Sequence, residues 1–174
     1  MAIKLRRQSD YLAVREALAT PELEDSQSLA SEEAFSFMYD NEGELEECKA
    51  LTDAQRRLLA LCSFYNAYNS DGLRDGVCYN NPHVIPLAAE AAKALNMTAL
   101  VAAIHAIRAA VPVDQLIASE QSERDGIVDD DELAERLESV EALLEAEELD
   151  GEIHRTVSVL LAKHPGEFFT LPAN

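Results

Sequence analysis

The chain has 174 residues, of which 48% are hydrophobic, and its 33 acidic and 14 basic residues give a formal net charge of −19. This hydrophobic content excludes an intrinsically disordered chain, and no apolar window reaches the roughly 18 residues of a membrane span. The excess of negative charge argues against direct binding to nucleic acid or anionic lipid, because phosphate groups are bound by Lys and Arg.

The N-terminus and the cysteines indicate a cytoplasmic protein. The first ten residues, MAIKLRRQSD, are basic but lack the apolar run of a signal peptide. The cysteines are Cys48, Cys62 and Cys78, and this odd number at spacings of 14 and 16 fits neither a disulfide framework nor a zinc site. We expect reduced thiols, with Cys62 in the core.

The first third of the chain is predicted to hold two short helices. Residues 10–19 have amphipathic spacing and stop before Thr20-Pro21. In the polar segment that follows, Ser31 can cap a helix that runs through Tyr39. Asn41-Glu42-Gly43 then has the composition of a turn.

A stronger helix signal begins at Thr52. Thr52-Asp53-Ala54-Gln55 is a capping box, in which each end residue's side chain bonds to the other's backbone N–H. Apolar residues at helical spacing continue the helix to about Tyr68: they are Leu58, Leu59, Cys62 and Tyr65. After it we expect a loop at Asn69-Ser70-Asp71-Gly72, whose glycine can take a positive φ, and a turn at Asn80-Asn81-Pro82.

Two helices rich in alanine are predicted next. Pro86 suits a first helical position, and Asn96 can end that helix. Thr98 can begin a second helix, which is apolar almost all round and ends at Pro112, so we expect it to be buried. His105 lies on this second helix and is predicted to be a core histidine rather than a ligand or a base.

The last third of the chain is predicted to be helical. A short helix covers residues 114–121, a long helix covers residues 130–149, and a third runs from Asp150 to His164, where Pro165-Gly166 breaks it. The apolar seam of the long helix consists of Leu133, Leu137, Val140 and Leu144. No strand pattern is found. The sequence therefore predicts an all-α fold, a single compact domain of six to eight helices over residues 1–174.

The acidic residues are concentrated in two blocks. Residues 22–53 contain eleven carboxylates and one Lys, residues 120–152 contain fifteen carboxylates and two Arg, and the segment between them is nearly neutral. On the 130–149 helix the carboxylates recur in steps of three and four residues, so they are expected to share one face. This predicted stripe consists of Asp131, Glu135, Glu138, Glu141, Glu145 and Glu148, with Glu152 just beyond the helix.

The predicted stripe has a charge spacing close to that of a phosphate strand. Its seven charges over about 31 Å of helix give one per ~5 Å, and duplex DNA offers one per ~3.4 Å along each strand. A second line of charge is predicted in the first block, at Glu42, Glu44, Glu46 and Glu47. The alternative interpretation is a solvated helix face that serves only solubility or salt adaptation.

Residues 121–132, QSERDGIVDDDE, have some features of a calcium-binding loop. Gly126 takes the sixth position and Glu132 the twelfth, but Gln121 stands at the first, where an aspartate is expected. A glycine turn that leads into an acidic helix terminus explains the same residues, because carboxylates complement the helix dipole there. We predict no metal site, and we keep a calcium-responsive module as an alternative.

The sequence contains no catalytic constellation. GxSxG, P-loop and GxGxxG motifs are absent, and the four histidines form no ligand pair at a metal spacing. Acidic pairs are too numerous to indicate acid–base chemistry. We therefore predict a protein that is not an enzyme and has no cofactor.

The stretch from Leu51 to His164 resembles a bacterial family of small α-helical proteins of unknown function. The resemblance is carried by LTDAQRRLLALCSFYNAYN, NNP, IPLAAEAAKALN, MTALVAAIHAIRAAV and LLAKHPGEFF. The family's run of asparagines and glycines stands here as Asn69-Ser70-Asp71-Gly72-Leu73, followed by Tyr79-Asn80. In this sequence, other residues replace the second Asn, the first Gly and the leading Phe of the family's motif. The resemblance implies a core at about 51–165, an acidic extension at 1–50, and a structural role for Asn69, Gly72 and Asn80.

The family's characterised member is an acidic, dimeric DNA-mimic protein that occupies the DNA-binding face of a transcription regulator. The resemblance implies a similar function here, in which rows of Asp and Glu imitate phosphates and block a DNA-binding protein, and it implies a homodimer. Two other binding functions stay open. One is an immunity-type inhibitor of a basic toxin or nuclease, and the other is the calcium-responsive module.

Overall fold

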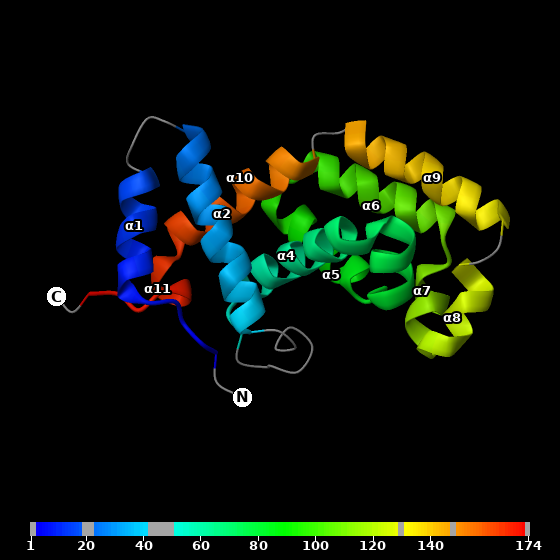
Figure 1. Cartoon of the computed structure of the whole chain (residues 1–174), viewed down its shortest axis with the longest axis horizontal. Coiled ribbons are helices and arrows are strands. Elements are labelled where there is room, and N and C mark those ends of the chain that lie inside the picture. The colour runs from blue at the N-terminus through cyan, green and yellow to red at the C-terminus, as the bar shows by residue number, and fades with distance from the viewer. Residues whose placement is uncertain (1–2, 19–22, 42–50, 129–130, 147–148, 173–174) are drawn as a thin grey trace. The chain divides into compact units, whose positions relative to one another are not determined.

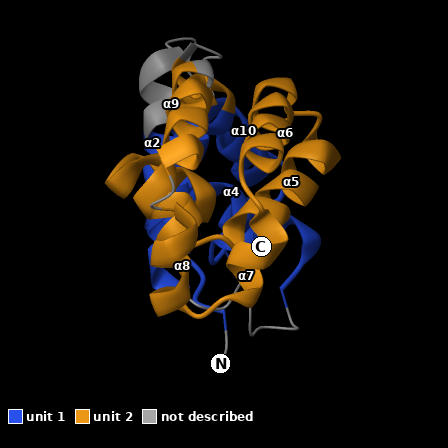
Figure 2. Cartoon of the chain, turned by 90° about the vertical axis from the view of Figure 1, so that its right-hand side faces the viewer, with its two compact units in different colours: residues 1–62, 153–174 blue, residues 63–152 orange. Residues whose placement is uncertain are grey.

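The regular elements in the described part of the chain are helices (Figure 1), which confirms the predicted all-α fold. The computed structural model describes residues 3–18, 23–41, 51–128, 131–146 and 149–172. Within these ranges, no helix is long and apolar enough to cross a membrane. The chain divides into two compact units (Figure 2): unit 1 comprises residues 1–62 and 153–174, and unit 2 comprises residues 63–152.

Unit 1 combines helices from both ends of the sequence. They are α1 (Gln8–Leu18), α2 (Leu23–Asp40), the first part of α4 (Asp53–Asp71), most of α10 (Leu149–Lys163) and α11 (Pro165–Phe168). α1 packs against α2. The buried rings of Phe37 and Phe168 meet edge to face, with centroids 5.2 Å apart. The N-terminal and C-terminal segments of the chain therefore share one apolar core.

The predicted capping box at the start of α4 is confirmed. Gln55 N donates to Thr52 Oγ1 over 3.2 Å, and Thr52 N donates to Gln55 Oε1 over 3.0 Å. Gln55 Nε2 also donates to the backbone carbonyl of Glu167 over 2.6 Å. The cap thus begins the helix and joins it to α11.

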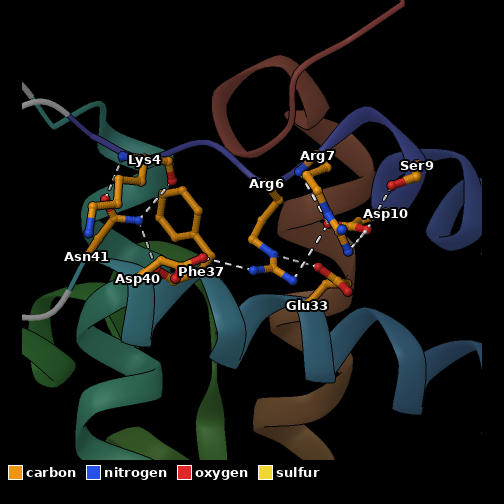
Figure 3. Close-up of polar contacts among 9 residues, drawn as sticks. All are labelled: Lys4, Arg6, Arg7, Ser9, Asp10, Glu33, Phe37, Asp40 and Asn41. Carbon is orange, nitrogen blue, oxygen red and sulfur yellow. Dashed lines mark hydrogen bonds and ion pairs between the residues drawn. The ribbon is translucent and has the colours of Figure 1, made fainter.

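Arg6 anchors the N-terminal segment within unit 1 (Figure 3). Its Nε and Nη1 atoms lie 2.8 Å from carboxylate oxygens of Glu33 and Asp40, and its Nη2 lies 3.6 Å from Asp10. Its backbone forms an isolated bridge, in which Arg6 N donates to Phe168 O over 2.8 Å. Two members of the first acidic block, Glu33 and Asp40, are therefore paired with a base.

α2 begins eight residues before the position predicted for its cap, so Ser31 lies in the helix interior. Ser31 is 3% exposed, and its Oγ lies 2.8 Å from Nδ1 of His154 on α10. The predicted cap was wrong because a serine in a polar stretch suits a cap and an internal hydrogen bond equally well. Of the turn predicted at 41–43, only Asn41 is described, and its Nδ2 donates to Phe37 O over 2.9 Å.

Unit 2 contains the rest of α4 and the helices that follow it. These are the π-helix η1 (Gly72–Asn80), α5 (Val84–Leu95), α6 (Thr98–Ala110), α7 (Val113–Ala118), α8 (Gln121–Val128) and α9 (Asp131–Ala146). α6 packs against both α5 and α9, and η1 packs against α7, α8 and α9. Asn96 takes a left-handed conformation, with φ of 57°, and ends α5 as predicted.

The segment between α4 and α5 differs from the prediction. α4 continues to Asp71, and Gly72–Asn80 forms a π-helix, so the loop predicted at residues 69–72 was wrong. The turn predicted at residues 80–82 is confirmed, because Pro82 and His83 form a turn in which Val84 N donates to Asn81 O over 3.0 Å. A π-helix has neither the 3.6-residue nor the two-residue period, so a search for those hydrophobic periods does not detect it. The helices η1, α8 and α11 are additions to the predicted set.

α6 is buried on one side only. Leu100, Ala103 and Ile107 face the core, whereas His105 and Arg108 are exposed. The predicted burial of the whole helix was wrong, and so was the assignment of His105 to the core. Both errors arise from the alanines of α6. Alanine occupies solvent-facing positions of this helix, where a polar residue would have indicated exposure.

Candidate partner-binding surface

α9 presents a row of carboxylates to solvent. Asp131, Glu135, Glu138 and Glu145 are exposed, and we refer to these four residues as the acidic face. The predicted seam is buried, with exposures between 2% and 7% for Leu133, Leu137, Val140 and Leu144. The amphipathic pattern of the long helix is therefore confirmed over its described part, Asp131–Ala146.

The acidic face is not neutralised locally. Among the described residues, no Lys, Arg or His lies within ion-pair distance of its four carboxylates. Arg136 is the base on α9, and its Nε donates to the backbone carbonyl of Glu132 over 3.1 Å. The face therefore presents a concentrated negative potential to the surrounding solvent.

Glu141 lies apart from the acidic face. Its Oε1 accepts a hydrogen bond from Leu73 N over 2.7 Å, at the start of η1. At 100° per residue, Glu141 is turned about 80° around the helix from Asp131, toward the side that packs against η1. The carboxylate of Glu141 satisfies an N–H at the start of η1, so Glu141 is not counted in the acidic face, and its role as a phosphate mimic stays a prediction.

Glu152 also serves an internal contact. Its two carboxylate oxygens accept hydrogen bonds from Ala99 N and Leu100 N, over 3.2 Å and 2.9 Å, in the first turn of α6. The negative charge there complements the dipole of α6. Glu152 is therefore a helix cap supplied by α10 and is not counted in the acidic face, and its role as a phosphate mimic stays a prediction.

The remaining predicted charges lie outside the described residues. They are Glu42, Glu44, Glu46, Glu47 and Glu148. The part of the stripe that the structure places on one exposed face thus consists of the four residues of the acidic face.

The predicted turn motif has a structural role at all three of its positions. Gly72 takes a φ of +74°, which glycine adopts without strain. Asn80 Oδ1 accepts a hydrogen bond from Gln121 Nε2 over 3.0 Å, which connects η1 with α8. Asn69 lies near the end of α4 and forms a hydrogen bond with Tyr65.

The hydroxyl of Tyr65 also donates to Asp150. Burial and this hydrogen bond raise the pKa of Tyr65 to about 12. Tyr65, like the turn motif, therefore connects elements of unit 2.

Gly76 is a structural residue that the sequence did not single out. A Cβ atom at this position would lie 1.9 Å from the backbone oxygen of Ala67, so only glycine fits where η1 crosses α4. Asn81 Nδ2 donates to Gly76 O over 2.9 Å. A lone glycine between apolar residues is weak evidence in a sequence, because it suits a bulge, a turn or a close contact.

The described parts of the segment considered as a calcium loop, residues 121–128 and 131–132, are helical. Gln121–Val128 forms α8, and Gly126 lies inside this helix without a positive φ, so the glycine makes no sharp turn. A calcium loop needs such a turn to direct its ligands toward the ion. Across the described ranges, no cluster of three or more His, Cys, Asp or Glu could hold a metal ion.

Two of the three cysteines are buried thiols. Cys62 lies in the core, as predicted, and Cys78 lies in η1. Burial raises the pKa of Cys62 far above its ordinary value. Burial and the nearby charge of Glu141 raise the pKa of Cys78 to about 12. Both thiols stay protonated near neutral pH, so neither is an activated nucleophile.

Comparison with known proteins gives one match. A family model described as DMP19-like protein matches residues 49–164, which is two thirds of the chain. Neither the curated proteins nor the solved structures contain a significant match. The matched residues include α4 through α9 and therefore the whole acidic face. By this match, the chain belongs to the DMP19-like protein family.

Proposed function

We propose that the protein binds a DNA-binding protein, such as a transcription regulator, through the acidic face of α9 and thereby excludes DNA. The observation that carries the proposal is the set of four exposed carboxylates on one helix face, without a basic partner among the described residues. Membership of the DMP19-like family supports the same function, because the acidic face lies inside the matched region.

The spacing of the acidic face suits a surface that binds DNA. Asp131 and Glu145 are fourteen residues apart, which corresponds to about 21 Å of helix. Four carboxylates over that length are about 7 Å apart on average, close to every second phosphate of one DNA strand. A row of Arg and Lys that holds alternate phosphates can therefore hold these carboxylates.

The charge of the whole chain supports fast association with a basic partner. A net charge of −19 attracts a cationic surface over long range, and added salt screens that attraction. We expect the association rate to fall steeply as the salt concentration rises.

The proposal is tested by neutralising the acidic face. The variant carries Glu135→Gln, Glu138→Gln and Glu145→Gln, which remove three charges with little change in shape. Three exposed charge contacts contribute about 0.2–1 kcal/mol each, so we expect affinity for the partner to fall by roughly tenfold. Capture from a lysate of the source organism identifies the partner, and surface plasmon resonance measures its affinity.

A matched control removes the same charge elsewhere. It carries Glu32→Gln, Glu90→Gln and Asp125→Asn, at exposed positions outside the acidic face. The control is expected to retain most of the affinity. If both variants lost the same affinity for the partner, net charge alone would explain binding. That result would contradict a specific role for the acidic face. Capture of a basic toxin that does not bind DNA would favour the inhibitor function instead.

A further inference from the structure

Unit 2 has a small crevice between α5 and α6, the helices that pack side by side (Figure 2). Its volume is about 230 Å³, and its apolar lining comes from Ala89 on α5 and from Val101 and Ile104 on α6. Ile104 is 3% exposed and therefore lies at the inner end. The crevice provides an apolar floor that is open to solvent.

The other residues that line the crevice are three bases. Lys93, His105 and Arg108 are all exposed. Lys93 lies one helical turn after Ala89, and His105 and Arg108 follow Val101 at steps of four and seven residues, so each base is on the same helix face as the floor. No carboxylate lines the crevice.

This group of bases is unusual for its surroundings. Residues 63–152 contain nineteen acidic residues but only five Lys and Arg. Three of the five donate to backbone carbonyls: Arg74 to Val128, Arg124 to Leu116 and Tyr79, and Arg136 to Glu132. The other two are Lys93 and Arg108. The two Lys and Arg residues of this acidic unit that do not donate to a backbone carbonyl therefore line one apolar crevice.

The positions of Lys93 and Arg108 are partly explained by their helices. Each lies in the last turn of its own helix, where a cation complements the dipole. That effect does not require both side chains to line the same crevice. An anion bound in the crevice would be attracted by the positive charge of both side chains.

We propose that the α5–α6 crevice binds a small carboxylate with an apolar tail. The tail lies on Ala89, Val101 and Ile104, and the carboxylate lies between Lys93 and Arg108, whose guanidinium can bind both carboxylate oxygens. At about 30 Å³ per water-sized group, the crevice has room for roughly eight non-hydrogen atoms. This is the size of a six-carbon acid. The site is independent of the acidic face.

The test uses hexanoate as the probe and NMR chemical shifts of the full chain as the readout. We expect saturable shifts in the amides of residues 89–108 at millimolar concentration. Two control compounds separate the parts of the probe. Acetate has the carboxylate without the apolar tail, and hexanol has the apolar tail without the carboxylate. Each is expected to bind at least tenfold more weakly than hexanoate.

Two variants separate the parts of the site. Lys93→Gln with Arg108→Gln is expected to weaken hexanoate binding at least tenfold, and Ala89→Leu is expected to do the same by filling the crevice. The control is Arg155→Gln with Lys163→Gln, which makes the same charge change at exposed positions of α10 and should retain binding. Thermal melts confirm that each variant is folded.

Three results would overturn the proposal. One is the absence of saturable shifts with hexanoate, and another is equal binding of hexanoate and hexanol. The third is an equal loss of binding in the crevice variant and in its α10 control.

Discussion

Glu141 is expected to stabilise unit 2 rather than to bind a partner. Its carboxylate accepts the Leu73 N–H at the start of η1, and a hydrogen bond to a charged group contributes roughly 1.5–3 kcal/mol. We predict that Glu141→Ala lowers the free energy of unfolding by about 2 kcal/mol in urea denaturation. Glu138→Ala, on the acidic face, should change it by less than about 0.5 kcal/mol. If both substitutions changed the free energy of unfolding equally, the stabilising role of Glu141 would be contradicted.

The buried cysteines should resist alkylation in the folded protein. Burial raises the pKa of Cys62 and Cys78, so at pH 8 neither forms the reactive thiolate, and neither side chain is accessible. We predict that iodoacetamide modifies them only after urea is added, as mass spectrometry can measure. Modification of Cys78 at the same rate in folded and unfolded protein would contradict its placement.

At the scale of single residues, the sequence predicts which carboxylates share a helix. It does not predict which of these carboxylates accept hydrogen bonds from other parts of the chain. The partners of Glu141 and Glu152 are the N–H groups of Leu73 and Leu100, which lie 68 and 52 residues away in the chain. Helical periodicity describes neighbours three and four residues apart, so it cannot detect such contacts. The structure therefore shows internal hydrogen bonds for two members of the predicted stripe, Glu141 and Glu152.

α8 contains a glycine that the fold does not require. A Cβ atom at Gly126 would occupy open space, and glycine in a helix costs roughly 0.5–1 kcal/mol relative to alanine. We predict that Gly126→Ala raises the free energy of unfolding by up to about 1 kcal/mol in urea denaturation. A loss of stability would show that the segment is not helical and would reopen the calcium interpretation.

At the scale of elements, the capped and periodic helices were predictable. α4 has a capping box, α5 ends at a left-handed Asn96, and α9 has a regular seam. The failures lie where local signals are ambiguous. η1 lacks the hydrophobic period that identifies a helix or a strand, and Ser31 suits both a helix cap and a helix interior. In α6, alanine occurs on both the buried and the exposed side, so the sequence does not show which side faces solvent. Tertiary packing decides each of these cases.

At the scale of the molecule, charge predicts how binding responds to salt. The affinity of the partner should fall with rising salt concentration, and the slope should be smaller for the variant with Glu135→Gln, Glu138→Gln and Glu145→Gln. Each charge contact removed also removes ions that are released on binding. Isothermal titration calorimetry over a range of salt concentrations measures both slopes. Identical slopes would show that the acidic face makes no contact with the partner.

Competition with duplex DNA tests the central claim most directly. The captured partner is bound to a labelled duplex, this protein is added, and fluorescence anisotropy reports the fraction of DNA that stays bound. We predict that the protein releases the DNA competitively, and that the variant with three Gln substitutions on the acidic face needs about ten times the concentration. A ternary complex that contains the partner, the DNA and this protein would contradict mimicry of DNA.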